Sequence, residues 1–82
     1  MKQLKALKDK FKSEYGEIET ALSQLSSREK KVIIWVYGLQ GYPMKQKDIA
    51  AQWSVTPRWI SDIKKTALNK LEDAKKSGRL KY

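Results

Sequence analysis

The spacing of apolar residues predicts that the chain begins with an amphipathic helix over residues 1–24. Apolar side chains recur there at alternating four- and three-residue intervals, which places them on one stripe of a helix. Gly16 lies within this segment and weakens a helix by about 1 kcal/mol relative to alanine, so the pattern allows a break there. The stripe consists of Met1, Leu4, Phe11, Tyr15, Ile18, Leu22 and Leu25, with Lys8 occupying one apolar slot.

Two uses of this stripe remain open from the sequence. It either packs on the rest of the domain or forms a coiled-coil seam between two copies of the chain, which would make a homodimer. A helix lying on a membrane surface is less well supported. Such a helix carries bases along its polar face, and here four acidic residues offset the five lysines among residues 1–25.

A second helix is predicted to begin at Ser26 or Ser27. Ser26 and Glu29 have the spacing of a capping box, in which each side chain accepts a hydrogen bond from the other residue's backbone N–H. Residues 32–37 are β-branched and aromatic, so propensity alone would also allow a strand. The cap before this run and Gly38 after it favour a helix.

Two further helices with a very short joint explain the pattern from Met44 onward. Ala50 is small, as two steeply crossing helices require where they meet, and Val55 is placed to plug the turn into the core. The second helix is predicted to start with Thr56 as N-cap and Pro57 at its first position. This arrangement is typical of a helix-turn-helix. Its apolar positions are Ile49, Ala50 and Trp53 before the turn, and Ile60, Ile63, Ala67, Leu68 and Leu71 after it.

Composition narrows the classes of function. The 82 residues suffice for one domain and include neither cysteine nor histidine, which excludes disulfides, Cys/His zinc sites and histidine acid–base catalysis. We therefore expect no enzyme, no cofactor and no metal. The chain has no apolar run near the roughly 20 residues of a membrane span, and no secretory signal, so we expect a cytoplasmic, nucleoid-associated protein without a membrane partner.

Charge points to a polyanionic partner. The chain has 18 basic and 9 acidic side chains, a formal charge of +9, and residues 54–82 alone carry eight basic and three acidic ones. Such an excess favours nucleic acid, and a helix-turn-helix favours double-stranded DNA. We expect the carboxyl-terminal part to meet it.

The outward face of the second helix of the pair supplies the candidate base contacts. In the major groove, Arg58 suits guanine O6 and N7, Asp62 suits cytosine N4, and Ser61 suits a base or a phosphate. Trp59 either contacts a thymine methyl or a sugar, or packs against the amino-terminal helix. The neighbouring lysines are placed for phosphates, which position a protein without reading sequence. They are Lys45, Lys47, Lys64 and Lys65.

The order and spacing of these motifs resemble region 4 of sigma-70-family sigma factors over residues 25–72. The resemblance implies a four-helix unit that reads the −35 promoter element and docks on the flap of the RNA polymerase β subunit. It also implies that Arg28 and Lys30 approach the DNA. The motifs that carry it are Leu25-Ser-Ser-Arg-Glu-Lys-Lys-Val-Ile, Tyr37-Gly38-Leu39, Lys47-Asp48-Ile49-Ala50, Val55-Thr56, Ile60-Ser61-Asp62-Ile63 and Ala67-Leu68-Asn69-Lys70-Leu71.

The chain departs from this family where the recognition helix opens. The family's usual Thr-Arg-Glu-Arg is replaced by Thr56-Pro57-Arg58-Trp59, so we do not expect the standard −35 sequence as the target. We also expect no sigma region 2, and the chain resembles the stand-alone region-4-like regulators of phages and bacteria. The candidate base-reading residues are Thr56, Pro57, Arg58, Trp59, Ser61 and Asp62, and the candidate phosphate-binding residues are Arg28, Lys30, Lys45, Lys47, Lys64 and Lys65.

The sequence thus predicts an all-α helix-turn-helix bundle of about four helices in a single domain, residues 1–82. Within it we expect the amino-terminal helix over 1–24, the region-4-like unit over 25–75 and a basic tail over 76–82. Two functions remain open. One is a sequence-specific DNA-binding transcription regulator that also contacts RNA polymerase. The other is an interaction module that binds RNA polymerase or a sigma factor with little DNA binding, and its association should depend little on salt.

Overall fold

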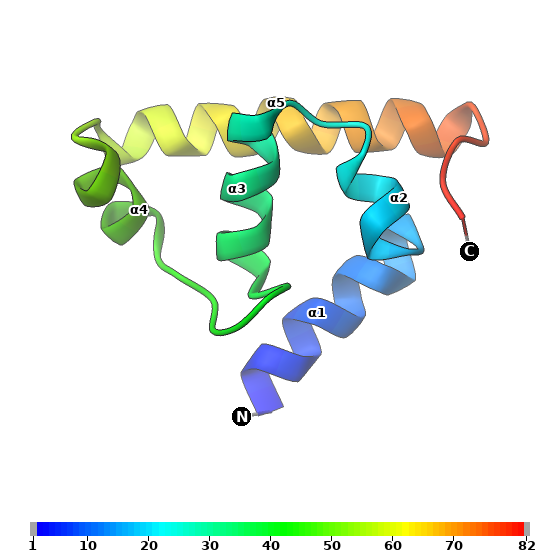
Figure 1. Cartoon of the computed structure of the whole chain (residues 1–82), viewed down its shortest axis with the longest axis horizontal. Helices are drawn as coiled ribbons and strands as arrows, with labels where there is room; N and C mark the ends of the chain where they lie inside the picture. The colour runs from blue at the N-terminus through cyan, green and yellow to red at the C-terminus, as the bar shows by residue number, and fades with distance from the viewer. Residues whose placement is uncertain (1, 82) are drawn as a thin grey trace.

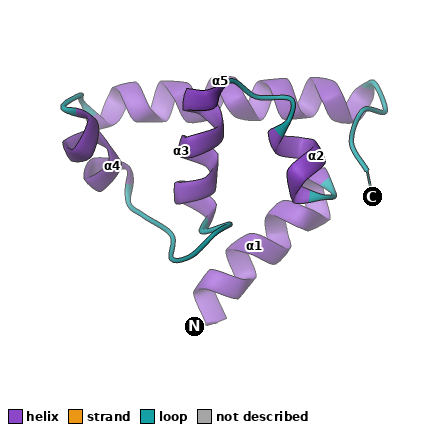
Figure 2. Cartoon of the chain, viewed as in Figure 1, coloured by secondary structure: helices purple, strands orange, loops and turns teal. Residues whose placement is uncertain are grey.

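The chain folds into five α-helices, as a computed structural model shows for the backbone of residues 2–81 and the side chains of residues 7–81. No strand occurs in this part of the chain (Figure 2). The predicted all-α class is confirmed, with five helices where about four were expected. They are α1 (Lys2–Tyr15), α2 (Ile18–Leu22), α3 (Ser27–Tyr37), α4 (Gln46–Trp53) and α5 (Pro57–Lys76).

Helix α5 organises the arrangement of the other four. It is the longest, with 20 residues, and α3 and α4 pack against it. In Figure 1, α3 crosses α5 steeply, α4 lies at the amino-terminal end of α5, and α1 and α2 lie on the other side of α3. The first turns of α5 therefore lie next to α4 and α3.

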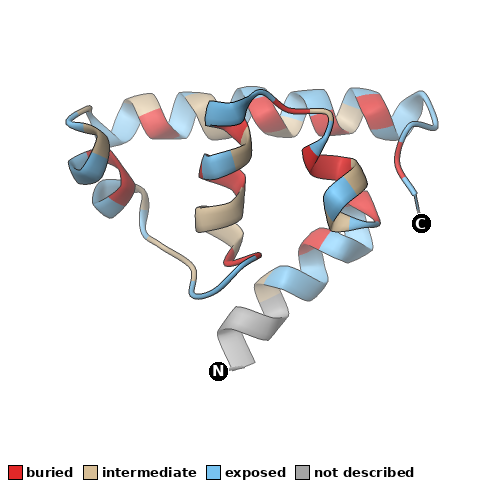
Figure 3. Ribbon diagram, viewed as in Figure 1, coloured by how far each residue is buried: buried red, intermediate tan, exposed pale blue. Residues whose placement is uncertain are grey.

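The apolar core forms two clusters, which correspond to these two sides of α3. Buried positions recur along α5 where the other helices meet it (Figure 3). The larger cluster joins α1, α2, α3 and the carboxyl-terminal half of α5, and includes Phe11, Tyr15, Leu22, Leu25, Ile33, Ala67, Leu71 and Ala74. The smaller cluster joins α3, α4 and the first turns of α5 through Val32, Ile49, Ala50 and Ile60.

The amino-terminal segment differs from the single helix that was predicted over residues 1–24. Gly16 adopts a positive φ of 79°, a conformation that glycine accepts readily, and this ends α1 before α2 begins. Phe11 and Tyr15 are buried, with their ring centroids 5.2 Å apart. The described part of the apolar stripe thus packs within its own domain, which favours packing over a dimer seam. Met1 and Leu4 lie outside the described side chains.

The segment predicted as a basic tail, residues 76–82, is partly built into the fold. It begins inside α5, which ends at Lys76. Leu80 is 8% exposed and belongs to the larger cluster. The Glu17 N–H donates to the Lys81 carbonyl at 2.6 Å. This segment therefore ties the end of the chain to the start of α2.

Helix α3 begins with the predicted capping box. Ser26 Oγ accepts from the Glu29 N–H at 3.4 Å, and Glu29 Oε1 accepts from the Ser26 N–H at 3.0 Å. Lys70 Nζ, from α5, donates to the same Oε1 at 2.8 Å. Burial raises the pKa of Glu29, but the hydrogen bonds from Lys70 and Ser26 outweigh it, so the net pKa lies below its ordinary value. Gly38 ends the helix in the left-handed conformation, as predicted.

No helix within residues 2–81 is long and apolar enough to cross a membrane.

Candidate nucleic-acid interface

Helices α4 and α5 form the helix-turn-helix that the sequence predicted. Helix α4 ends at Trp53, and Ser54 turns the chain with a φ of 56°. The Val55 N–H donates to the Ala50 carbonyl at 3.0 Å, which closes the turn. Thr56 Oγ1 accepts from the Trp59 N–H at 3.2 Å and caps α5, with Pro57 at its first position. The cap and the turn thus fix the direction in which α5 leaves α4.

The first turns of α5 present one polar face to solvent. Arg58, Ser61, Asp62 and Lys65 are all exposed. Successive residues of an α-helix are rotated by about 100°, so these four positions lie on one side of the helix. Ile60, on the opposite side, is fully buried against α3 and α4. Three of the predicted base-reading residues and one predicted phosphate-binding residue therefore lie together.

Lys64 does not share that face, contrary to the sequence prediction. It follows Ile60 by four residues and precedes Ala67 by three, and both of those side chains are fully buried. Residues at these spacings lie on the same side of a helix, so Lys64 borders the core. Its Nζ lies 6.0 Å from the centroid of the Tyr37 ring. Burial raises the pKa of Tyr37 above its ordinary value.

Trp59 packs on α3 and α4, whereas one of its two predicted roles was packing against the amino-terminal helix. Its ring meets that of Trp53 edge-on at a centroid distance of 6.3 Å, and Trp53 in turn lies 5.6 Å from Trp35. The guanidinium carbon of Arg28 lies 4.8 Å from the Trp59 ring centroid. Such a cation–π contact contributes about 0.5–1 kcal/mol at an exposed site. Trp59 remains only half-buried and borders the exposed face of α5.

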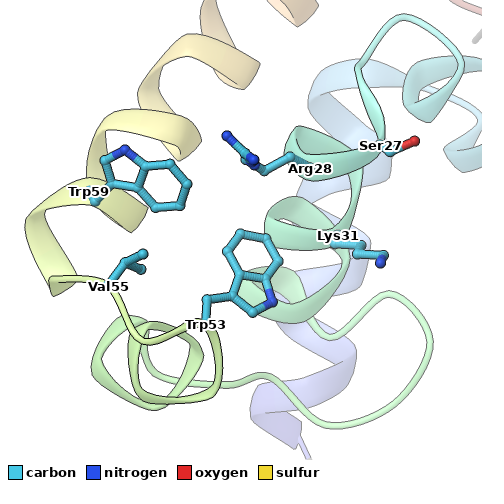
Figure 4. A pocket seen from close by; sticks show the side chains of 6 residues that line it. All are labelled: Ser27, Arg28, Lys31, Trp53, Val55 and Trp59. Atoms are coloured by element: carbon cyan, nitrogen blue, oxygen red, sulfur yellow. The ribbon is translucent and has the colours of Figure 1, made fainter.

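Arg28 and Lys31 of α3 line the space beside Trp59, and Lys30 is not among the residues that line it. Both are exposed and border a cavity of about 540 Å³ (Figure 4). Lys30 follows Arg28 by two residues, and residues at that spacing do not face the same side of a helix. The sequence analysis missed Lys31, although its three-residue spacing from Arg28 was a usable signal. The cavity is lined by Ser27, Arg28, Lys31, Trp53, Val55 and Trp59.

Lys45 and Lys47 lie at the start of α4 and are exposed. Lys45 is the N-cap residue, and its side chain makes no capping hydrogen bond. Helix α4 has eight residues. At a rise of about 1.5 Å per residue, its start lies about 12 Å from the turn. These two lysines therefore form a separate basic position rather than part of the α5 face.

A family model matches the part of the chain that contains these helices. The family model described as Sigma-70, region 4 matches residues 21–73. The match covers more than half of the chain, from the end of α2 to most of α5. It therefore contains α4, the turn and most of α5, and confirms the resemblance inferred from the motifs. No curated protein and no solved structure matches the chain.

Proposed function

The chain belongs to the sigma-70 region 4 family and carries its DNA-binding helix-turn-helix, and from this premise we propose that it is a sequence-specific regulator of transcription. The family is one of DNA-binding regulatory domains and not of enzymes, and its members bind DNA and RNA polymerase. The proposal extends this to one recognition helix, α5, that reads a sequence other than the standard −35 element.

The exposed polar face at the start of α5 is the observation that carries the proposal. Four side chains there can donate or accept hydrogen bonds, and no other part of the described chain covers them. The major groove is about 12 Å wide and admits one α-helix. The steep crossing of α3 and α5, seen in Figure 1, keeps α3 beside the start of α5 without covering this face.

Each side chain of that face suits a different contact. Arg58 matches the two acceptors of guanine, and Asp62 accepts from the amino group of cytosine. Asp62 also repels phosphates, which favours its placement over base edges. Ser61 binds either kind of group, while Lys65 binds the DNA backbone. Thr56 and Pro57 are exposed at the tip of the helix, where the proline ring suits a thymine methyl.

Basic side chains on both flanks of α5 are placed for contacts with the DNA backbone. Arg28 and Lys31 lie on the α3 side of the recognition helix, and Lys45 and Lys47 lie at the start of α4. The proposed phosphate set therefore includes Lys31 and omits Lys30 and Lys64, because of where these side chains lie. RNA polymerase is the proposed second partner, since family members bind both.

Selection from a random duplex pool tests the proposal. The purified protein is mixed with the pool at two salt concentrations, and the retained duplexes are sequenced. We expect enrichment of one motif, with retention that weakens at the higher salt because counterions are released from each neutralised phosphate. A palindromic motif would show that two copies bind together. No retention at low salt would refute the proposal and leave RNA polymerase subunits as the partner to test.

A further inference from the structure

The cavity beside the start of α5 combines aromatic and cationic side chains in a way that DNA backbone contacts alone do not require. Its volume is about 540 Å³. Trp53, Val55 and Trp59 form apolar walls that the fold leaves half-buried. Arg28 and Lys31 both line the cavity from α3; Arg28 points toward the indole rings, and the ammonium group of Lys31 points away from them (Figure 4). Figure 4 shows Arg28 extending from α3 toward Trp59, with the two indole rings on the side of α4 and α5.

Charge in this cavity has a single sign. Its lining within the described chain contains two cations and no carboxylate. The adjoining pocket, which shares Arg28 and Trp59 with this cavity, is lined by two acidic residues: Glu29, whose carboxylate is bound to Lys70, and Asp62, on the outward face of α5. A cleft with charge of one sign over apolar walls concentrates ligands of the opposite charge.

We propose that this cavity binds a planar aromatic anion, a chemistry shared by nucleotides and aromatic carboxylates. Indole rings favour stacked or edge-on contacts with another aromatic ring, and a guanidinium group binds phosphate or carboxylate through paired hydrogen bonds. The volume lies within the range of about 300–1,000 Å³ typical of small-molecule pockets. A ligand that has both an aromatic ring and a negative charge contacts the indole rings and the cationic side chains together. A neutral aromatic ring contacts only the indoles, and an anion without a ring contacts only the cations.

Occupancy of the cavity has a consequence for DNA binding. Arg28 lies over Trp59 and also belongs to the proposed phosphate set, so a ligand that draws its guanidinium toward the cavity removes one backbone contact. A bound ligand therefore weakens binding to DNA. This consequence rests on the proposed function, whereas ligand binding itself does not.

Nuclear magnetic resonance of the full chain tests the site without DNA. Each of the three tryptophans gives its own indole N–H signal, and adenosine 5′-monophosphate is the first probe. We expect the Trp53 and Trp59 signals to move with a Kd of about 1 mM or tighter, and adenosine or inorganic phosphate alone to bind at least about tenfold more weakly. Indole-3-acetate is the second probe and distinguishes the two classes of ligand. If adenosine 5′-monophosphate binds and indole-3-acetate does not, the cavity is a nucleotide site. If indole-3-acetate binds, the cavity is a site for aromatic carboxylates.

A matched pair of variants tests whether the probe binds at this cavity or binds to basic side chains anywhere on the protein. Lys31→Ala should weaken binding of the probe at least about threefold, because it removes one of two cations from the cavity. Lys12→Ala removes an exposed lysine from α1 and should leave the affinity unchanged. The site is ruled out if neither probe moves the two indole signals, or if both variants weaken binding equally. Either result leaves the DNA selection experiment unaffected, so the two proposals fail separately.

Discussion

Replacing Glu29 separates two interactions that one carboxylate makes at the start of α3. Its Oε1 accepts from the Ser26 N–H at 3.0 Å and from Lys70 Nζ at 2.8 Å. Glu29→Gln keeps an oxygen for the cap but removes the negative charge that faces Lys70. Glu29→Ala removes both interactions. The Lys70 side chain is 46% exposed, so water and salt screen the ion pair.

The structure gives the size and order of the two effects. Loss of a partly exposed ion pair costs up to about 1 kcal/mol. A backbone hydrogen bond of the cap adds about 1 kcal/mol, so the alanine variant should lose about 1–2 kcal/mol in all. For a domain of this size 1 kcal/mol lowers Tm by about 4–8 °C. We therefore expect thermal unfolding, followed by circular dichroism, to rank wild type above Glu29→Gln and Glu29→Ala last.

The pH dependence of stability tests the ion pair between Glu29 and Lys70 in a second, independent way. The folded-state pKa of Glu29 lies below its ordinary value, so the ion pair contributes stability at neutral pH. That contribution is lost as the pH falls through the lowered pKa. The difference between wild type and Glu29→Gln should therefore shrink in acid. The exposed Glu19→Gln, in α2, is the control for loss of a carboxylate.

Two results would refute this reasoning. One is a stability difference between wild type and Glu29→Gln that stays constant down to acid pH. The other is a double variant, Glu29→Gln with Lys70→Met, whose loss equals the sum of the two single losses, because partners in one ion pair are not additive.

Three further predictions test the fold and the interface. Gly16→Ala should destabilise the protein by about 1 kcal/mol, since residue 16 holds a positive φ of 79°. Urea unfolding measures this loss, and an unchanged unfolding midpoint would contradict the break between α1 and α2. Leu80→Ala should cost about 2–3 kcal/mol because this side chain is buried, and a loss below 0.5 kcal/mol in the same assay, typical of a surface site, would show that the tail is not packed. Lys65→Ala should reduce the salt slope of DNA binding by about 0.9 on any duplex, whereas Lys76→Ala, on the same face near the other end of α5, should leave the slope unchanged.

The two ends of α3 and the start of α5 were predictable because local residues fix them. The capping box of Ser26 and Glu29, the left-handed Gly38, and the pair Thr56-Pro57 each act within a few residues of sequence. All three features are present in the structure. Family motifs at the same positions then identified the architecture, as the match over residues 21–73 confirms.

The placement of side chains at the flanks of α5 was not predictable in the same way. The spacing of Lys64 from Ile60 and Ala67 already indicated that it borders the core. Its contact with Tyr37, however, depends on where α3 crosses α5, and that crossing is set by contacts distant in sequence. Trp59 likewise finds its partners on α3 and α4. Leu80 is a single apolar residue in a basic segment, so no periodicity marked it as part of the core.

The most direct test of the account compares two substitutions on the duplex recovered by selection. Arg58→Ala removes a cation from the proposed base-reading face, and Lys76→Ala removes one from the same side of α5 near its other end. The account predicts that Arg58→Ala weakens binding to the selected duplex by about 1–3 kcal/mol, roughly fivefold to 150-fold in Kd, with a smaller effect on an unrelated duplex. Lys76→Ala should have little effect on either. Equal losses for both variants on both duplexes would contradict the claim that α5 reads sequence in the major groove.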